Sequence, residues 1–98
     1  MKEDLLKIIN HYGVMSQLKY LQSEVFEFNE AIIQAEEFKK INDRYNIFNI
    51  TNIEEEFADV MVMLEQFKAY YNLDNDKIIE MMKFKINRQL ERINNENK

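Results

Sequence analysis

Apolar side chains recur at the spacing of a helix face in four separate stretches of this chain. The stretches cover about residues 2–11, 14–40, 51–72 and 75–94. Gly13, the only glycine, separates the first two, because glycine adopts a positive φ without steric cost. Short connections between long amphipathic helices make neighbours antiparallel. The pattern therefore predicts an all-α antiparallel bundle of about four helices, with a short N-terminal helix, two long core helices and a C-terminal helix.

The apolar stripes of the second and third helices are expected to form the buried zone of this bundle, and the fourth helix carries a stripe of the same kind. These stripes are Leu18, Leu21, Val25, Phe28 and Ile32 in the second helix, Phe57, Val60, Met61, Leu64, Phe67 and Tyr71 in the third, and Ile79, Met82, Ile86, Leu90 and Ile93 in the fourth.

Between the second and third helices the helical spacing is lost. Residues 41–51 gather asparagine and aspartate, which predicts a loop. Thr51 followed by Glu54 has the pattern of a capping box, in which each side chain satisfies a backbone donor near the other. The third helix is therefore expected to begin at Thr51.

Composition narrows the class of protein. The chain has 98 residues, one glycine, one histidine, and no proline or cysteine. An all-β fold needs many more turn residues, and disulfides, thiol nucleophiles and zinc fingers need cysteine. No apolar run approaches the length of a membrane span, and the acidic, polar N-terminus is not a secretion signal. We expect one cytoplasmic domain over residues 1–98, with a polar tail at about 94–98.

The net charge and the number of large apolar side chains indicate which partners the protein is expected to bind. Thirteen basic against 18 acidic residues give a net charge of −5, which disfavours binding to a nucleic-acid backbone. Seven phenylalanines, five tyrosines and six methionines are many for a chain of this length, which buries only about two-thirds of its unfolded surface. Some of these groups are expected to be buried against another subunit.

Two carboxylate pairs are the strongest candidates for chemistry: Glu24 with Glu27, and Glu56 with Asp59. Spacing of i, i+3 places each pair on one helical face. At 100° per residue, both pairs lie roughly 70° and 130° from the centre of their apolar stripe, on the same side. Two antiparallel helices would then bring four carboxylates together at the edge of the core.

Such a cluster is unfavourable without a cation, because close like charges repel one another. Carboxylates without histidine or cysteine favour a hard ion, Mg²⁺ or alternatively Mn²⁺. Mg²⁺ is usually completed by water and substrate phosphate, so the cluster indicates metal-assisted attack of water on a phosphoanhydride. Each pair by itself is also typical of an ordinary helix surface.

A basic pair lies on the fourth helix. Lys85 and Arg88 have i, i+3 spacing on one flank of the stripe, where they are suited to bind phosphate. The alternative is that they complement the dipole of the last helix.

In these features the chain resembles the MazG-type all-alpha nucleoside triphosphate pyrophosphohydrolases, especially the short stand-alone forms of phages and low-GC bacteria. The resemblance rests on residues 17–32, on Glu55-Glu56-Phe57-Ala58-Asp59-Val60, and on Lys85-Ile86-Asn87-Arg88-Gln89-Leu90. These segments match the family's Glu-x-x-Glu, its Glu-x-x-Asp and its C-terminal basic stretch. Ser23, Lys83 and Gln89 depart from the family pattern.

The resemblance implies that Glu24, Glu27, Glu56 and Asp59 are catalytic and bind Mg²⁺. It also implies that Lys85 and Arg88 contact phosphate and that Gln17 approaches the base. The expected reaction converts a (deoxy)nucleoside triphosphate to its monophosphate and pyrophosphate. The resemblance further implies assembly as a homodimer or homotetramer. The alternative hypothesis is a non-catalytic helical oligomerisation or interaction module on the same scaffold.

Overall fold

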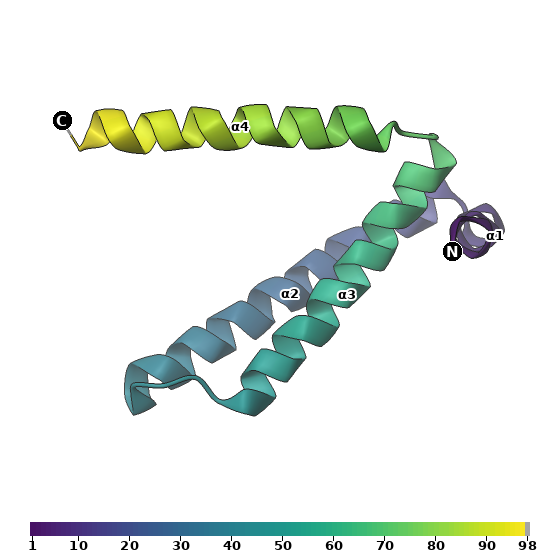
Figure 1. Cartoon of the computed structure of the whole chain (residues 1–98). Helices are drawn as coiled ribbons and strands as arrows, with labels where there is room; N and C mark the ends of the chain where they lie inside the picture. The colour runs from purple at the N-terminus through teal and green to yellow at the C-terminus, as the bar shows by residue number, and fades with distance from the viewer. Residues whose placement is uncertain (98) are drawn as a thin grey trace.

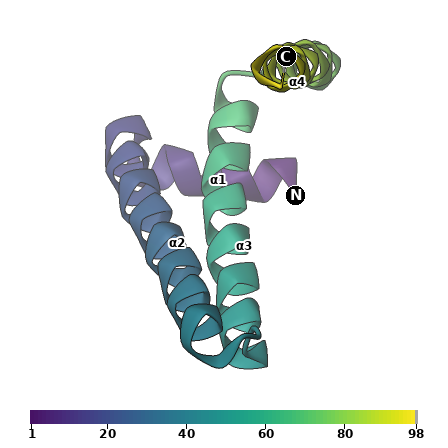
Figure 2. The same cartoon turned by 90° about the vertical axis from the view of Figure 1, so that its left-hand side faces the viewer.

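The structure is a computed structural model that describes residues 1–97, all of whose regular secondary structure is helical. Its four helices are α1 (Lys2–Tyr12), α2 (Val14–Asn42), α3 (Ile47–Tyr70) and α4 (Asn75–Glu96). Helices α2 and α3 form a long antiparallel hairpin, α1 runs across one end of it, and α4 projects away (Figures 1 and 2). The prediction of an all-α chain with four helices is confirmed.

Gly13 makes the sharp connection between α1 and α2. Its φ of 93° lies in the region that glycine adopts at little cost, and its N–H donates to the Ile9 carbonyl at 2.8 Å. The predicted end of the first helix is confirmed to within one residue. The turn directs α1 across the hairpin rather than along it (Figure 2).

The predicted loop at residues 41–51 is wrong, because α3 begins at Ile47. Asn46 is the N-cap, and its side-chain oxygen accepts a hydrogen bond from the Phe48 N–H at 2.8 Å. Thr51 therefore lies inside the helix and makes no capping box. The actual loop is shorter than the run of asparagine and aspartate residues indicated, because it lies between the end of α2 at Asn42 and the start of α3 at Ile47. Within it, Asp43 takes a left-handed conformation with φ of 59°.

The fully buried side chains lie along one seam between the helices. They are Ile9 of α1, Gln17, Ala31 and Ala35 of α2, and Met63 and Gln66 of α3. Small alanine side chains let the two long helices approach closely, and positions seven residues apart keep facing the partner helix, as in a coiled coil. The rings of Phe28 and Phe57 meet edge to face beside this seam, with centroids 6.0 Å apart.

The predicted core stripes are only partly buried. Val25 and Ile32 are 39% and 38% exposed, and Leu64 is 46% exposed, because they lie on a flank of the seam rather than in it. The expected antiparallel packing of α4 on its neighbour is not found within residues 1–97 of the single chain. Among the residues that the structure describes, α4 does not pack along the other three helices, and its first residue, Asn75, accepts a hydrogen bond from Lys68 of α3.

The open arrangement is visible in the dimensions of the chain. Its radius of gyration is 17.3 Å, whereas a compact domain of this length has about 13 Å. Helix α4 extends to Glu96, so part of the predicted polar tail is helical, and Lys98 lies outside the described residues. Within residues 1–97, no helix is both long and apolar enough to cross a membrane.

Candidate functional site

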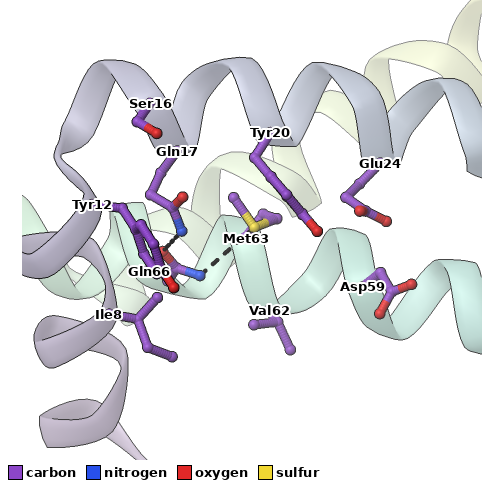
Figure 3. A pocket seen from close by; sticks show the side chains of 10 residues that line it. All are labelled: Ile8, Tyr12, Ser16, Gln17, Tyr20, Glu24, Asp59, Val62, Met63 and Gln66. Carbon is purple, nitrogen blue, oxygen red and sulfur yellow. Dashed lines mark hydrogen bonds between the residues drawn. The ribbon is translucent and has the colours of Figure 1, made fainter.

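Three of the four predicted carboxylates meet between the two long helices. Glu24 comes from α2, and Glu56 and Asp59 come from α3; each offers an oxygen, and these oxygens all lie within 4.8 Å of one another. Figure 3 shows Glu24 and Asp59 on facing helices at one end of a cavity. Glu24 and Glu56 are half-buried, and Asp59 is exposed. We refer to these three residues as the acidic triad.

Glu27 lies one turn further along α2 and is exposed. It is not a member of the triad, but its charge contributes to raising the pKa of both Glu24 and Glu56. The fourth predicted carboxylate is therefore electrostatically coupled to the triad from its periphery.

The triad is electrostatically unfavourable by itself. Burial is the largest cause that raises the pKa of Glu56, followed by the charge of Asp59. Burial also contributes most to the raised pKa of Glu24, followed by the charges of Asp59 and Glu56. In addition, Oε2 of Glu56 is buried and has no hydrogen-bond partner within the described part of the chain. A buried, unpaired carboxylate oxygen is costly unless a cation compensates it.

The protein does not supply that cation from residues 1–97. The two ion pairs in this range are Lys68 with Glu65 and Lys83 with Glu80, and neither involves the triad. Three carboxylates suit a hard divalent ion such as Mg²⁺, which takes oxygen ligands and keeps several waters.

A cavity of about 620 Å³ extends from the triad toward α1. Glu24 and Asp59 lie at one end and Tyr12 at the other, while Tyr20 projects between them (Figure 3). The volume is within the usual range of small-molecule sites, roughly 300–1,000 Å³. The triad therefore borders a space in which a ligand of nucleoside size can lie.

A buried amide pair forms the wall of this cavity. Nε2 of Gln17 donates to Oε1 of Gln66 at 2.8 Å, and Nε2 of Gln66 lies 3.6 Å from the Met63 sulfur (Figure 3). Gln17 and Gln66 are only 6% and 2% exposed. Gln17, for which the family resemblance implies a contact with the base, thus lines the cavity next to the triad.

Gln66 also lines the cavity, and it was not identified from the sequence. It lies seven residues after Asp59, just as Gln17 lies seven residues before Glu24. This symmetric spacing on two antiparallel helices is the signal that could have identified it, because residues seven apart share a face.

We predict that replacing one glutamine of this amide pair destabilises the protein more than replacing both. Gln66→Leu leaves a buried Gln17 amide without its partner and is expected to lower the free energy of unfolding by about 1–3 kcal/mol. The double variant Gln17→Leu/Gln66→Leu should recover part of this loss. Urea denaturation of the two single variants and the double variant measures the coupling. Additive losses would show that the hydrogen bond contributes nothing.

Lys85 and Arg88 are not brought to the triad within the single chain. Both lie on α4, where the Arg88 guanidinium is 6.0 Å from the centre of the Phe84 ring. Within the described residues α4 does not pack along α1–α3, so Lys85 and Arg88 lie apart from the triad.

The raised pKa of Glu24 predicts a pH-dependent effect of Glu24→Gln in the absence of divalent ions. A carboxyl whose pKa is higher in the folded state costs stability once it ionises. The variant should therefore match wild type below about pH 4.5, the ordinary glutamate value, and become more stable than wild type as the pH rises above it. Thermal melts from pH 4 to 8 with EDTA test this, with the exposed Glu37→Gln as the matched control. A stability difference that does not change with pH would contradict the prediction.

Comparisons of the chain with protein-family models, with curated proteins and with solved structures found no match.

Proposed function

We propose that this chain is a Mg²⁺-dependent hydrolase that converts a nucleoside triphosphate to its monophosphate and pyrophosphate. The observation that carries the proposal is the buried, unpartnered Oε2 of Glu56 inside a triad that opens on the cavity. The MazG-like spacing of the four carboxylates supports the same reaction class.

Glu24, Glu56 and Asp59 would hold the metal ion, and Glu27, at the edge of the triad, would hold a water or a second ion. Mn²⁺ fits the same oxygen ligands. When bound, the metal neutralises the triad and polarises a phosphate oxygen. The carboxylates bind and orient the ion, and one not occupied in binding it can accept a proton from the attacking water.

The cavity would take the nucleoside part of the substrate. Tyr12 and Tyr20 offer aromatic faces, and the amide pair of Gln17 and Gln66 offers hydrogen-bonding groups in a largely dry environment. Binding sites for nucleotide bases use this combination of aromatic stacking and a few fixed polar contacts.

The phosphate contacts proposed for Lys85 and Arg88 need another copy of the chain, since the chain's own α4 leaves them apart from the triad. Their removal by Lys85→Ala or Arg88→Ala would then raise KM only under conditions in which the chain is assembled.

A non-catalytic interaction module is the second candidate, and the exposed apolar stripe of α4 favours it. The two candidates differ in what Mg²⁺ does. Binding at the triad raises the melting temperature of wild type, whereas a module without a metal site shows no such increase.

The deciding experiment is incubation of the protein with a panel of ribo- and deoxyribonucleoside triphosphates and Mg²⁺. Chromatography should detect monophosphate and pyrophosphate in equal amounts. Release of orthophosphate and a nucleoside diphosphate would show that a different phosphoanhydride bond is cleaved. The hydrolase would be excluded if no nucleotide is turned over and Mg²⁺ does not stabilise the protein.

A further inference from the structure

The buried amide pair in the wall of the cavity is part of a chain of three side chains. Nε2 of Gln17 donates to Oε1 of Gln66 at 2.8 Å, and Nε2 of Gln66 donates to the sulfur of Met63 at 3.6 Å. All three side chains line the cavity, and they are only 2–6% exposed. Because side chains this buried are held in place by packing, the open question is which end of each amide points where.

The sulfur of Met63 sets the direction of the chain. A thioether sulfur accepts a hydrogen bond and has no hydrogen to donate, whereas a glutamine amide has a donor end and an acceptor end. The NH₂ group of Gln66 therefore turns to the sulfur, and the oxygen of Gln66 turns to Gln17. The reversed amide would place its oxygen against the sulfur, two acceptors without a hydrogen between them, which is costly in a buried position.

The same direction passes on to Gln17. Because the Gln66 oxygen accepts from its NH₂ group, Gln17 keeps Oε1 on the side of the amide away from Gln66 (Figure 3). Within residues 1–97 no hydrogen bond reaches this oxygen. It is also not sealed in the core, since the buried side-chain oxygen without a partner in this range is Oε2 of Glu56. Oε1 of Gln17 is therefore a free acceptor that a ligand in the cavity can reach.

The other polar groups in this part of the cavity have no fixed direction. They are the hydroxyls of Tyr12, Ser16 and Tyr20. A hydroxyl turns to donate or to accept as its partner requires, so it does not distinguish one from the other. Among the residues that line the cavity away from the triad, Gln17 thus presents the polar atom whose character the protein itself determines.

Gln17 lies where the outer edge of a base would be. It precedes Glu24 by seven residues on the same helix, which is about 10 Å along α2. A nucleotide whose phosphates lie at the triad extends its base away from the triad, and the exocyclic group at the outer edge of the base is far from the sugar. We therefore expect this exocyclic group to meet the Gln17 end of the cavity.

We propose that Met63 and Gln66 are positioning residues that hold Oε1 of Gln17 toward the cavity. This acceptor selects a base with an exocyclic amino group, cytosine or adenine, over a base with a carbonyl in the same place, uracil or hypoxanthine. An amino group donates to Oε1, whereas a carbonyl oxygen meets it as a second acceptor and both lose their hydrogen bonds to water. The inference rests on the proposed function in one respect, that the cavity takes the nucleoside.

Binding of nucleosides tests the selectivity without any hydrolysis. NMR titrations in EDTA compare cytidine with uridine and adenosine with inosine, two pairs in which an amino group is replaced by a carbonyl. In the pair that binds better, the amino-bearing nucleoside should have a Kd at least about tenfold lower. Equal affinities or a preference for the carbonyl would overturn the inference, and so would no binding of any of the four at about 10 mM.

Met63→Leu tests whether the sulfur sets the direction. Leucine has nearly the same volume but accepts no hydrogen bond, so the amide pair becomes free to reverse and the ratio of the two Kd values should fall below about threefold. Met61→Leu makes the same change on the same helix at a residue outside the cavity and should keep the wild-type ratio. An unchanged ratio in Met63→Leu would show that the sulfur does not position the amides.

A rescue variant separates positioning from a loss of packing. In Met63→Leu/Gln66→Glu, a carboxylate offers only acceptor oxygens, so Gln17 must again turn its NH₂ group to residue 66 and its oxygen to the cavity. At pH 8 this double variant should regain the preference for the amino-bearing nucleoside, which restored packing alone would not produce. Circular dichroism confirms that the helices are kept, and a folded double variant without the preference contradicts the relay from Met63 to Gln17.

These outcomes are separate from those of the proposed function. Hydrolysis of triphosphates at rates that do not depend on the base would overturn the selectivity and leave the hydrolase in place. Selective binding of nucleosides without turnover of any triphosphate would leave the selectivity in place and count against the hydrolase.

Discussion

Glu56→Gln is expected to lower kcat/KM for triphosphate hydrolysis by at least about a hundredfold, or roughly 3 kcal/mol of transition-state stabilisation. Glutamine keeps the shape of the side chain but removes the charge of the oxygen that lies buried and unpartnered in the triad. The same change removes one of the three carboxylates that meet within 4.8 Å. Metal binding and turnover should therefore fall together.

Steady-state kinetics and thermal melts with and without Mg²⁺ measure both effects. At a Mg²⁺ concentration about 100 times the Kd, binding stabilises wild type by about 2.7 kcal/mol, and most of this gain should be absent in the variant. Without Mg²⁺ the variant should be at least as stable as wild type, since burial and neighbouring charges raise the pKa of Glu56. Exposed Glu54→Gln makes the same change of charge two residues away and should retain wild-type activity. Full activity of Glu56→Gln would falsify the proposed site.

Ile9→Ala is expected to give the largest loss of stability, about 2–5 kcal/mol. Ile9 is fully buried, and it is the one completely buried apolar side chain that α1 contributes within the described residues. Because α1 packs mainly on α3, truncation leaves a void that the short helix cannot close without shifting. A loss of this size is a large part of the stability of a small domain.

Urea denaturation measures this loss, and Ile8→Ala is the matched control because Ile8 is half-buried on the cavity side of the same helix. The control should lose clearly less. Ile9→Ala should also weaken nucleotide binding, since α1 places Tyr12 at the end of the cavity. Equal losses for the two variants would mean that α1 is not anchored through Ile9.

The number of helices followed from local signals in the sequence, and so did most of their ends. Gly13 and the apolar spacing on either side of it place the first connection correctly. The start of α3 was misplaced because Thr51 and Glu54 match a capping box, while the actual cap, Asn46, lies in a polar segment that also contains other asparagines. A cap depends on the backbone conformation of its residue, which several candidates in one segment can adopt.

The candidate site was only partly predictable, because local spacing does not determine contacts between helices. Spacing of i, i+3 places two carboxylates on one face of each helix, but it does not determine which of them reaches across to the other helix. Glu27 lies on the same side of α2 as Glu24, but it is exposed and is not one of the three carboxylates that meet. Gln66 was not identified because a glutamine in a helix is ordinarily a surface residue.

By itself, the sequence determined that the chain is helical, where its acidic pairs stand on their helices, and that it has more apolar surface than one small core can bury. These properties depend on neighbours within one or two turns and on composition. Only the tertiary structure decided which face of α2 meets α3, because small side chains at Ala31 and Ala35 let the helices approach along a seam beside the stripes of larger apolar residues. That choice joins Glu24 to Glu56 and Asp59, opens the cavity beside them, and leaves many of the large apolar side chains of α2, α3 and α4 exposed.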